Sequence, residues 1–129
     1  MFKKKTILVK QGPNSHYFEF HFPFSLWWSF KKMSTTRKGS QRPEGLKQSV
    51  YWLTRKIIST GVVKAVFVSQ DHLGFSIKVP DTKINSAQEQ IEEMILSHFF
   101  LGRLRFRFEH VRVSFSYLNE ARHLNPRRG

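Results

Sequence analysis

The chain has no cysteine, few acidic residues and no long apolar segment. Without a thiol it can form no disulfide, no thiolate metal site and no iron–sulfur cluster, and it has no cysteine nucleophile. A membrane span needs roughly 18 consecutive apolar residues. The longest candidate, 18–30, is interrupted by Glu19, His21 and Pro23. We therefore expect no membrane partner.

Positive charge dominates what is present. Only 9 Asp and Glu oppose 22 Lys and Arg among 129 residues, which gives a formal net charge of +13. Such an excess of cations is more than solubility requires and is typical of proteins that bind RNA or DNA. Hydrophobic residues make up 40% of the chain and aromatic residues 15%, which is too apolar for a disordered basic tail. The composition predicts one folded domain with a polyanionic partner.

Basic segments flank and interrupt this domain. We expect a basic arm with one short strand at 1–15, a single domain at 16–118 and a basic tail at 119–129. Within the domain, the polar and turn-rich segment 31–45 is predicted to be an exposed basic loop. The basic N-terminal part also resembles an organellar transit composition, but we favour an arm that contacts phosphates.

Hydrophobic spacing predicts the first elements of the domain. In 16–24, alternate phenylalanines indicate a strand with one apolar face. From residue 46 the period changes to that of a helix that stops at Gly61, because apolar residues follow a 4-3-4 spacing at Leu46, Val50, Leu53 and Ile57. Arg55 and Lys56 lie off this apolar stripe.

The second half continues with strands and a helix. Residues 62–68 and 75–79 are predicted to form a hairpin that turns at 70–74. Ser86 and Glu89 have the form of a capping box, at the start of a second amphipathic helix that ends at Gly102. Residues 103–108 then alternate arginine with apolar residues, as a strand does, and a shift of parity indicates a bulge or turn at Glu109-His110.

This order of elements predicts the fold class. We expect an α+β fold, a ferredoxin-like βαββαβ sandwich in which an antiparallel sheet carries two helices on one face, with basic terminal extensions.

The last predicted strand places three arginines on one face. Each guanidinium there could bind an anionic oxygen in a bidentate manner. The alternative is an edge strand whose charges prevent aggregation. We favour RNA contact, because lysine and arginine also recur in the loops and termini. The predicted RNA-binding residues are Lys3, Lys4, Lys5, Lys31, Lys32, Arg37, Lys38, Arg42, Arg103, Arg105, Arg107, Arg127 and Arg128.

Two aromatic features could stack on bases. Phe75 lies in a predicted strand, but the segment 72–79 lacks the later aromatics of an RNA-recognition motif, which favours core packing. Trp27 and Trp28 would point in opposite directions from a strand, so we expect one of them in the core.

Catalytic and metal motifs are not evident. His16 and His21 would lie on opposite faces of their strand, and the remaining histidines are scattered along the chain. The sequence contains no phosphate-binding glycine loop of Walker or Rossmann form and no His-Glu-x-x-His motif. We therefore expect no enzyme activity, no metal, no cofactor and no small-molecule substrate.

The first predicted helix resembles that of the small-subunit ribosomal protein ten family. Segment 46–61 carries, without a gap, the family's Leu-x-Gln-Ser start, an aliphatic residue at Leu53 and a closing Thr-Gly. Phe75-Ser76-Ile77 is similar to the family's Phe-Thr-Val strand, and 86–92 resembles the start of its second helix with one residue inserted. The resemblance covers about residues 46–95. The family's proline-rich hairpin tip, which reaches RNA and neighbouring proteins, is replaced here by a segment without proline.

The resemblance implies a structural, RNA-binding component of the small ribosomal subunit. Its expected partners are ribosomal RNA and neighbouring small-subunit ribosomal proteins. The divergence and the basic additions favour the mitochondrial ribosome, with the cytoplasmic ribosome as the alternative.

A second resemblance is to the N-terminal domain of Nfu-type iron–sulfur scaffolds. In those domains a helix precedes a Gly-Val-Lys-x-Val-Phe strand, a second strand and another helix, and residues 61–67 read Gly-Val-Val-Lys-Ala-Val-Phe. Those domains are less basic, and this chain has no cysteine for a cluster. The alternative function is therefore an Nfu-like interaction module in iron–sulfur protein maturation, without cluster ligands.

Overall fold

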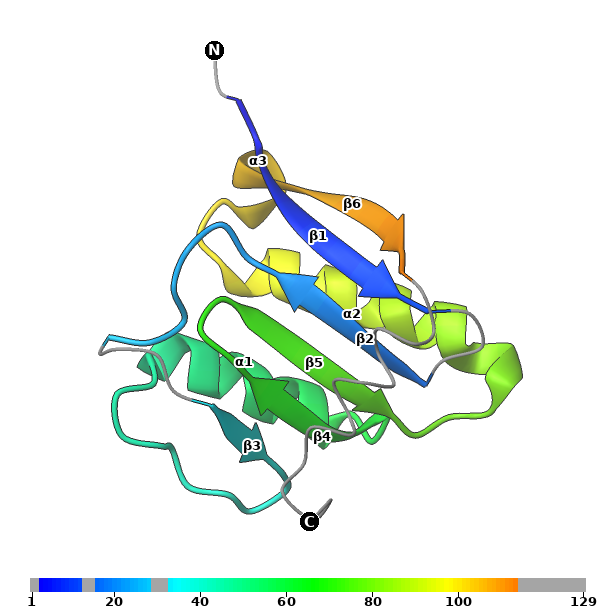
Figure 1. Ribbon diagram of the computed structural model, residues 1–129, viewed down its shortest axis with the longest axis horizontal. Coiled ribbons are helices and arrows are strands. Elements are labelled where there is room, and N and C mark those ends of the chain that lie inside the picture. Colours follow the sequence, from blue (N-terminus) through cyan, green and yellow to red (C-terminus); the bar gives the residue numbers. More distant parts are fainter. Residues whose placement is uncertain (1–2, 13–15, 29–32, 114–129) are drawn as a thin grey trace.

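Six strands form one sheet in this computed structural model, which describes residues 3–12, 16–28 and 33–113. Their order across the sheet is β3-β4-β5-β2-β1-β6 (Figure 1). All neighbouring pairs are antiparallel except β1 and β6, which are parallel. The strands are β1 (Lys5–Gln11), β2 (Tyr17–His21), β3 (Ser34–Thr36), β4 (Val63–Val68), β5 (His72–Ile77) and β6 (Phe106–Arg112).

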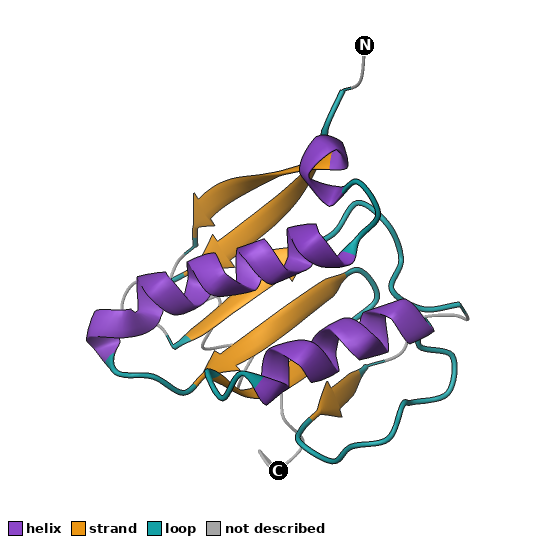
Figure 2. Ribbon diagram, turned by 180° about the vertical axis from the view of Figure 1, so that it is seen from behind, coloured by secondary structure: helices purple, strands orange, loops and turns teal. Residues whose placement is uncertain are grey.

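Two long helices cover one face of this sheet (Figure 2). They are α1 (Gln48–Ser59) and α2 (Ile84–His98), and a short α3 (Gly102–Arg105) precedes β6. The α+β class and the placement of both main helices on one face are therefore confirmed. None of the helices in the described residues is long and apolar enough to cross a membrane.

Phenylalanine fills the layer between sheet and helices. Phe18 and Phe20 of β2 are fully buried, and the ring of Phe20 packs edge to face on Phe75 of β5 with centroids 5.4 Å apart. Such edge contacts between aromatic rings add to the free energy of burial. Phe24 and Phe99 continue this packing toward the end of α2. The alternating phenylalanines thus face the helices, as predicted.

The helix and hairpin predicted from residue 46 are present. Leu46, Val50, Leu53 and Ile57 are all buried. The chain leaves α1 through Gly61, whose positive φ of 84° favours glycine. β4 and β5 then pair as an antiparallel hairpin, although β5 begins at His72, inside the predicted turn.

The simple βαββαβ topology is wrong. β1 pairs antiparallel with β2, in the position beside β2 where that topology places its last strand. A short connection joins β1 to β2, so this pairing needs little loop closure and competes well with a distant strand. β6 therefore adds outside β1, parallel to it, and the sheet is mixed rather than antiparallel.

The segment 31–45 is not a loop throughout. Ser34–Thr36 forms β3, the edge strand beside β4, and Thr36 is buried. These three polar residues show no hydrophobic alternation. The strand therefore forms because it pairs with β4, and no local pattern predicts it.

α2 begins earlier than the predicted capping box. A 3-10 turn at Asp81–Lys83 leads directly into the helix, which starts at Ile84 with no side-chain cap. Ser86 therefore lies within the first turn instead of preceding it. The helix also ends at His98, earlier than predicted.

The predicted arginine strand is wrong in its first half. Leu101 has a positive φ of 55°, and a Cβ at Gly102 would collide with the backbone of Leu96. The chain reverses tightly there, and residues 102–105 form α3 instead of a strand. The predicted bulge at Glu109-His110 is wrong too, since β6 pairs with β1 residue by residue from Phe106 to Arg112.

Candidate nucleic-acid interface

The solvent-facing side of α1 is basic and aromatic. Trp52 is 48% exposed, and Arg55 and Lys56 beside it are exposed. The Arg55 guanidinium carbon lies 5.7 Å from the ring centroids of both Tyr51 and Trp52, within the range of a cation–π contact. α1 contains no acidic residue. Its outer side therefore offers flat rings together with positive charge that has no carboxylate partner among the described residues.

A second exposed tryptophan lies near the start of α1. Trp28 is 75% exposed, whereas Trp27 is 3% exposed and donates from its indole to the Ser69 carbonyl at 2.8 Å. One of the pair thus lies in the core, as expected. The Trp28 amide donates to the Gly45 carbonyl at 2.7 Å, and the Lys47 Nζ lies 4.8 Å from a Trp28 ring centroid. This geometry holds Trp28 close to the beginning of α1.

The segment between β3 and α1 brings further cations to the same side. Arg37, Lys38 and Arg42 are exposed there. The Tyr51 hydroxyl of α1 donates to the Ser40 carbonyl at 2.7 Å, and Arg42 Nη1 donates to a backbone carbonyl just before α1 at 2.9 Å. Arg42 is thereby tied directly to the start of the helix, and Arg37 and Lys38 lie in the turn that Ser40 closes beside it.

We call this set the basic–aromatic surface. From residue 20 to residue 70 the sequence holds one acid, Glu44. Exposed aromatic rings stack on bases of any sequence, and neighbouring cations neutralise backbone phosphates. The surface can therefore contact both parts of a single-stranded nucleic acid. Its members are Trp28, Arg37, Lys38, Arg42, Lys47, Trp52, Arg55 and Lys56.

A smaller basic cluster lies at the opposite edge of the sheet. Lys3, Lys4 and Lys5 are exposed at the start of β1, and Thr6 pairs with Arg107 of β6. The structure therefore brings the N-terminal lysines close to Arg107, although the two segments are far apart in sequence (Figure 1).

The three arginines of the predicted row do not share a face. Arg103 lies in α3 and forms an ion pair with Glu93 of α2. Arg105 donates to the Phe100 carbonyl at 2.9 Å. The alternation of arginine with apolar residues did not reflect burial, since Leu104 is 58% exposed. Arg103 is already neutralised by a carboxylate, so it is the least available of the three for a phosphate.

Four predicted RNA-binding residues and the predicted tail lie outside the described residues. They are Lys31, Lys32, Arg127, Arg128 and the segment 119–129.

The face of the sheet opposite the helices carries a polar group that sequence analysis missed. We call Glu19, His21 and His72 the His–Glu cluster. Glu19 is only 3% exposed, and its Oε1 lies 2.8 Å from His21 Nε2. His21 and His72 are opposite residues of β2 and β5, and their rings stack with centroids 4.2 Å apart. Asp71 Oδ1 lies 3.3 Å from His72 Nδ1.

Tyr17 completes the surroundings of the buried carboxylate. Its hydroxyl donates to Glu19 Oε2 at 2.8 Å. The ring lies against β5 because Gly74, which pairs with Glu19, has no side chain, and a Cβ there would collide with the Tyr17 hydroxyl and ring. Both oxygens of Glu19 are therefore engaged, as a buried carboxylate requires.

The cluster perturbs the pKa values of two of its members. Burial raises the pKa of Glu19, but the hydrogen bonds from His21 and Tyr17 and the nearby imidazoles outweigh this, so its pKa lies below the usual value. Burial, and then the neighbouring His21, lowers the pKa of His72 against the opposing effect of Glu19 and Asp71. The state favoured at neutral pH is an ionised Glu19 beside a neutral His72.

The prediction that His16 and His21 lie on opposite faces of their strand gave no indication that His21 meets His72. Glu19 and His21 share a face by the alternation of a strand, which the sequence does show. Their meeting with His72 depends on the register between β2 and β5. No local pattern in the sequence specifies that register.

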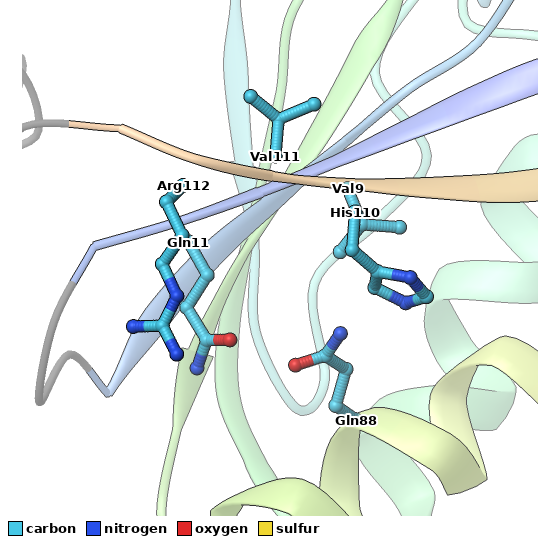
Figure 3. A pocket seen from close by; sticks show the side chains of 6 residues that line it. All are labelled: Val9, Gln11, Gln88, His110, Val111 and Arg112. Atoms are coloured by element: carbon cyan, nitrogen blue, oxygen red, sulfur yellow. The ribbon is translucent and has the colours of Figure 1, made fainter.

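A shallow hollow lies between β1, β6 and α2 (Figure 3). Its volume is about 180 Å³. Pockets that bind small ligands usually have a volume of at least about 300 Å³. His110 lines it and is held by Glu92 Oε2 at 2.6 Å. The lining residues Val9, Gln11, Gln88, His110, Val111 and Arg112 include no serine, cysteine or lysine nucleophile.

Comparison with known proteins adds little. No protein-family model and no curated protein sequence matches the chain. The crystal structure of protein SAV1430 from Staphylococcus aureus is similar at a TM-score of 0.45 and 13% sequence identity, over 68% of this chain and 99% of that chain. Likeness at this level supports no statement about fold or function.

Proposed function

We propose that this chain is a non-enzymatic RNA-binding protein and a structural component of the small ribosomal subunit. The observation that carries the proposal is the basic–aromatic surface on a chain with a net charge of +13. Two exposed tryptophans lie there among lysines and arginines, Trp52 on a helix without acids and Trp28 close to its start. Exposed aromatic rings among cations are the combination of side chains that binds single-stranded nucleic acid.

The two kinds of side chain have different roles in this proposal. Arg37, Lys38, Arg42 and the cations of α1 neutralise phosphates and release condensed counterions, which supplies affinity without sequence preference. Trp28 and Trp52 stack on unpaired bases, which selects loops and single strands over regular duplex. The lysines at the start of β1 and Arg107 add phosphate contacts at the far edge of the sheet.

The assignment to the ribosome rests on the resemblance of residues 46–95 to the small-subunit ribosomal protein ten family. In this chain the β4–β5 hairpin closes at once between Val68 and His72, so no long tip reaches outward. In this proposal the basic–aromatic surface contacts RNA in place of the hairpin tip, which does so in that family. The mitochondrial ribosome is the proposed location, with neighbouring small-subunit ribosomal proteins as further partners.

Salt dependence tests the RNA-binding part of the proposal. The affinity of the intact chain for a single-stranded ribosomal RNA fragment is measured across a range of salt concentrations. Phosphate contacts by the six cations of the basic–aromatic surface predict a slope of log affinity against log salt of about −4. A slope near zero, with binding to protein partners instead, would overturn the proposal in favour of the Nfu-like interaction module.

Co-sedimentation tests the ribosomal part. The tagged chain is expected to travel with mitochondrial small subunits in moderate salt and to be released as salt rises. Co-sedimentation with cytoplasmic subunits would move the assignment to that particle, and strong RNA affinity without any ribosomal association would remove it.

A further inference from the structure

Three side chains on the open face of the sheet offer the donors of a transition-metal site. Glu19 contributes a carboxylate, and His21 and His72 contribute imidazoles. One ligand atom from each lies within 4.8 Å of the other two. Two imidazoles and one carboxylate form a donor set that suits Zn²⁺ and its first-row neighbours.

We propose that the His–Glu cluster binds one divalent transition-metal ion, for which Zn²⁺ is the probe, and leaves a fourth position for water or another ligand. This binding is separate from RNA binding, because the cluster lies on the face of the sheet opposite α1. It does not depend on the proposed function.

The spacing of the donors is close to what an ion needs. Zinc lies about 2 Å from nitrogen and oxygen ligands, so two ligands of a tetrahedral ion lie about 3.3 Å apart. Glu19 Oε1 and His21 Nε2 are 2.8 Å apart in a hydrogen bond, so they separate slightly when the ion replaces the proton between them. The ligand atom of His72 lies within 4.8 Å of both and approaches by at most about 1.5 Å.

The backbone holds two of the ligands on adjacent rigid strands. His21 and His72 are directly paired residues of β2 and β5, and Glu19 lies on the same face as His21, two residues earlier. Sites built on strands are held more accurately than sites on loops. The strands thus preset the two imidazoles next to the carboxylate.

Two of the three ligands, His72 and Glu19, also have an outer partner. Asp71 Oδ1 lies 3.3 Å from His72 Nδ1, which orients the ring and directs its other nitrogen to a metal. The Tyr17 hydroxyl donates to Glu19 Oε2 at 2.8 Å and leaves Oε1 as the ligand atom. Partners of this kind tune metal affinity by about 10- to 100-fold.

An ion can reach the cluster from solvent. The Glu19 carboxylate lies beneath, nearly buried, while the imidazoles of His21 and His72 are partly exposed. Asp71 is exposed at the same end of β5 and adds a second negative charge. These two carboxylates offset locally the positive charge of the whole chain.

Titration of the intact, metal-free chain with Zn²⁺ and with Co²⁺ tests the proposal. We expect one Zn²⁺ per chain by calorimetry and a Co²⁺ absorption spectrum of low coordination number, which reports ligation directly. His72→Gln and His21→Asn should each weaken Zn²⁺ binding by more than about 100-fold, beyond the effect of an outer partner. Asp71→Asn should weaken it by about 10- to 100-fold.

Matched variants separate ligation from general metal binding. His110 and Glu92 form a two-ligand pair on the other side of the sheet, 2.6 Å apart, so His110→Gln should leave Zn²⁺ affinity unchanged. Glu19→Gln keeps the shape of the buried side chain, and its circular dichroism shows whether the fold is retained. RNA affinity should not change in any ligand variant.

Two results would overturn the proposal. One is Zn²⁺ affinity that stays the same in His72→Gln and His21→Asn, whether or not it falls in His110→Gln. The other is a wild-type chain that binds no Zn²⁺ and gives no Co²⁺ ligation spectrum.

Discussion

The two helices that cover the sheet bury similar apolar stripes but present opposite chemistry to solvent. α1 carries Arg55 and Lys56 and no acid, whereas α2 carries three glutamates and neither lysine nor arginine. Both pack on the same face of the same sheet (Figure 2). Packing therefore fixes the inner side of each helix and leaves the outer side free to serve function.

The charges of the two helices are also used differently. On α2, Glu93 pairs with Arg103 and Glu92 with His110, so its acids are largely satisfied within the fold. Among the described residues, neither Arg55 nor Lys56 of α1 has a carboxylate partner, and Arg55 lies over the rings of Tyr51 and Trp52. If the chain binds RNA as proposed, the unneutralised cations of α1 and the internally paired acids of α2 make α1 the helix that faces it.

Replacing the cations in and just before α1 should have the largest effect on RNA binding. The triple variant Lys47→Gln, Arg55→Gln and Lys56→Gln is expected to weaken binding to single-stranded RNA and to reduce the salt slope by about 2, because each lost phosphate contact removes about 0.7.

The control for this variant changes net charge equally elsewhere. Lys64, Lys78 and Lys83 are exposed and lie outside the basic–aromatic surface, so their replacement by glutamine should change the slope little. Equal losses in the two triple variants would mean that overall charge, and not α1, determines binding.

Removing one ring from α1 should have the next largest effect. Trp52→Ala is expected to lower RNA affinity by about 5- to 150-fold, since stacking on one base contributes about 1–3 kcal/mol. The side chain is half exposed, so thermal stability should change little. Phe100→Ala, which removes a ring exposed just after α2, is the matched control, and comparable losses of affinity would contradict the role of Trp52.

The residue at the start of α1 allows a further comparison of the two helices. Lys47 has the extended backbone of an N-cap but makes no capping hydrogen bond. Lys47→Asp should stabilise the fold by about 0.5–2 kcal/mol through a capping bond and a favourable helix dipole interaction, while RNA affinity falls.

Lys83 supplies the control at the start of α2. Its backbone is not extended, with φ of −114° and ψ of 9°, so Lys83→Asp should give no comparable gain in urea unfolding. A stability gain at Lys47 without loss of affinity would show that this lysine has no part in RNA contact.

The smallest expected effect is a pH dependence where the helices meet. His98 Nε2 of α2 lies 2.7 Å from the Ser49 carbonyl of α1. Burial lowers the pKa of His98, against the hydrogen bond to Ser49, and Lys56 lowers it further. The folded state then binds fewer protons than the unfolded state, so this contribution to stability is complete above the unfolded pKa of about 6.5 and is lost as pH falls below it.

Unfolding by urea across this pH range measures the effect. The His98→Gln variant should show a flatter decline of stability on acidification than the wild type. Parallel profiles of stability against pH for the two proteins would contradict this role of His98.

Local patterns predicted much of the fold. The 4-3-4 spacing from Leu46 gave α1, and the β-branched run after Gly61 gave the hairpin, because helix period and strand propensity act within a few residues. The exposed cations Arg37, Lys38 and Arg42 also lie where a polar loop was expected.

Non-local choices could not be predicted in the same way. The insertion of β1 between β2 and β6 depends on competition between pairings, and the tight reversal at Leu101 overrides the alternation that followed it. The meeting of His21 with His72 depends on strand register. Trp52 joined no predicted site, since only the structure shows that its ring lies outside the core among cations.

The most direct test of the role of α1 is hydroxyl-radical footprinting of the intact chain with and without single-stranded RNA. Trp28 and Trp52 are exposed and react readily in the free protein, and Met94, half-buried on α2, reports on the other helix. We predict that RNA protects both tryptophans from oxidation and leaves Met94 unchanged. Protection of Met94, with Trp28 and Trp52 as reactive as in the free protein, would contradict the account.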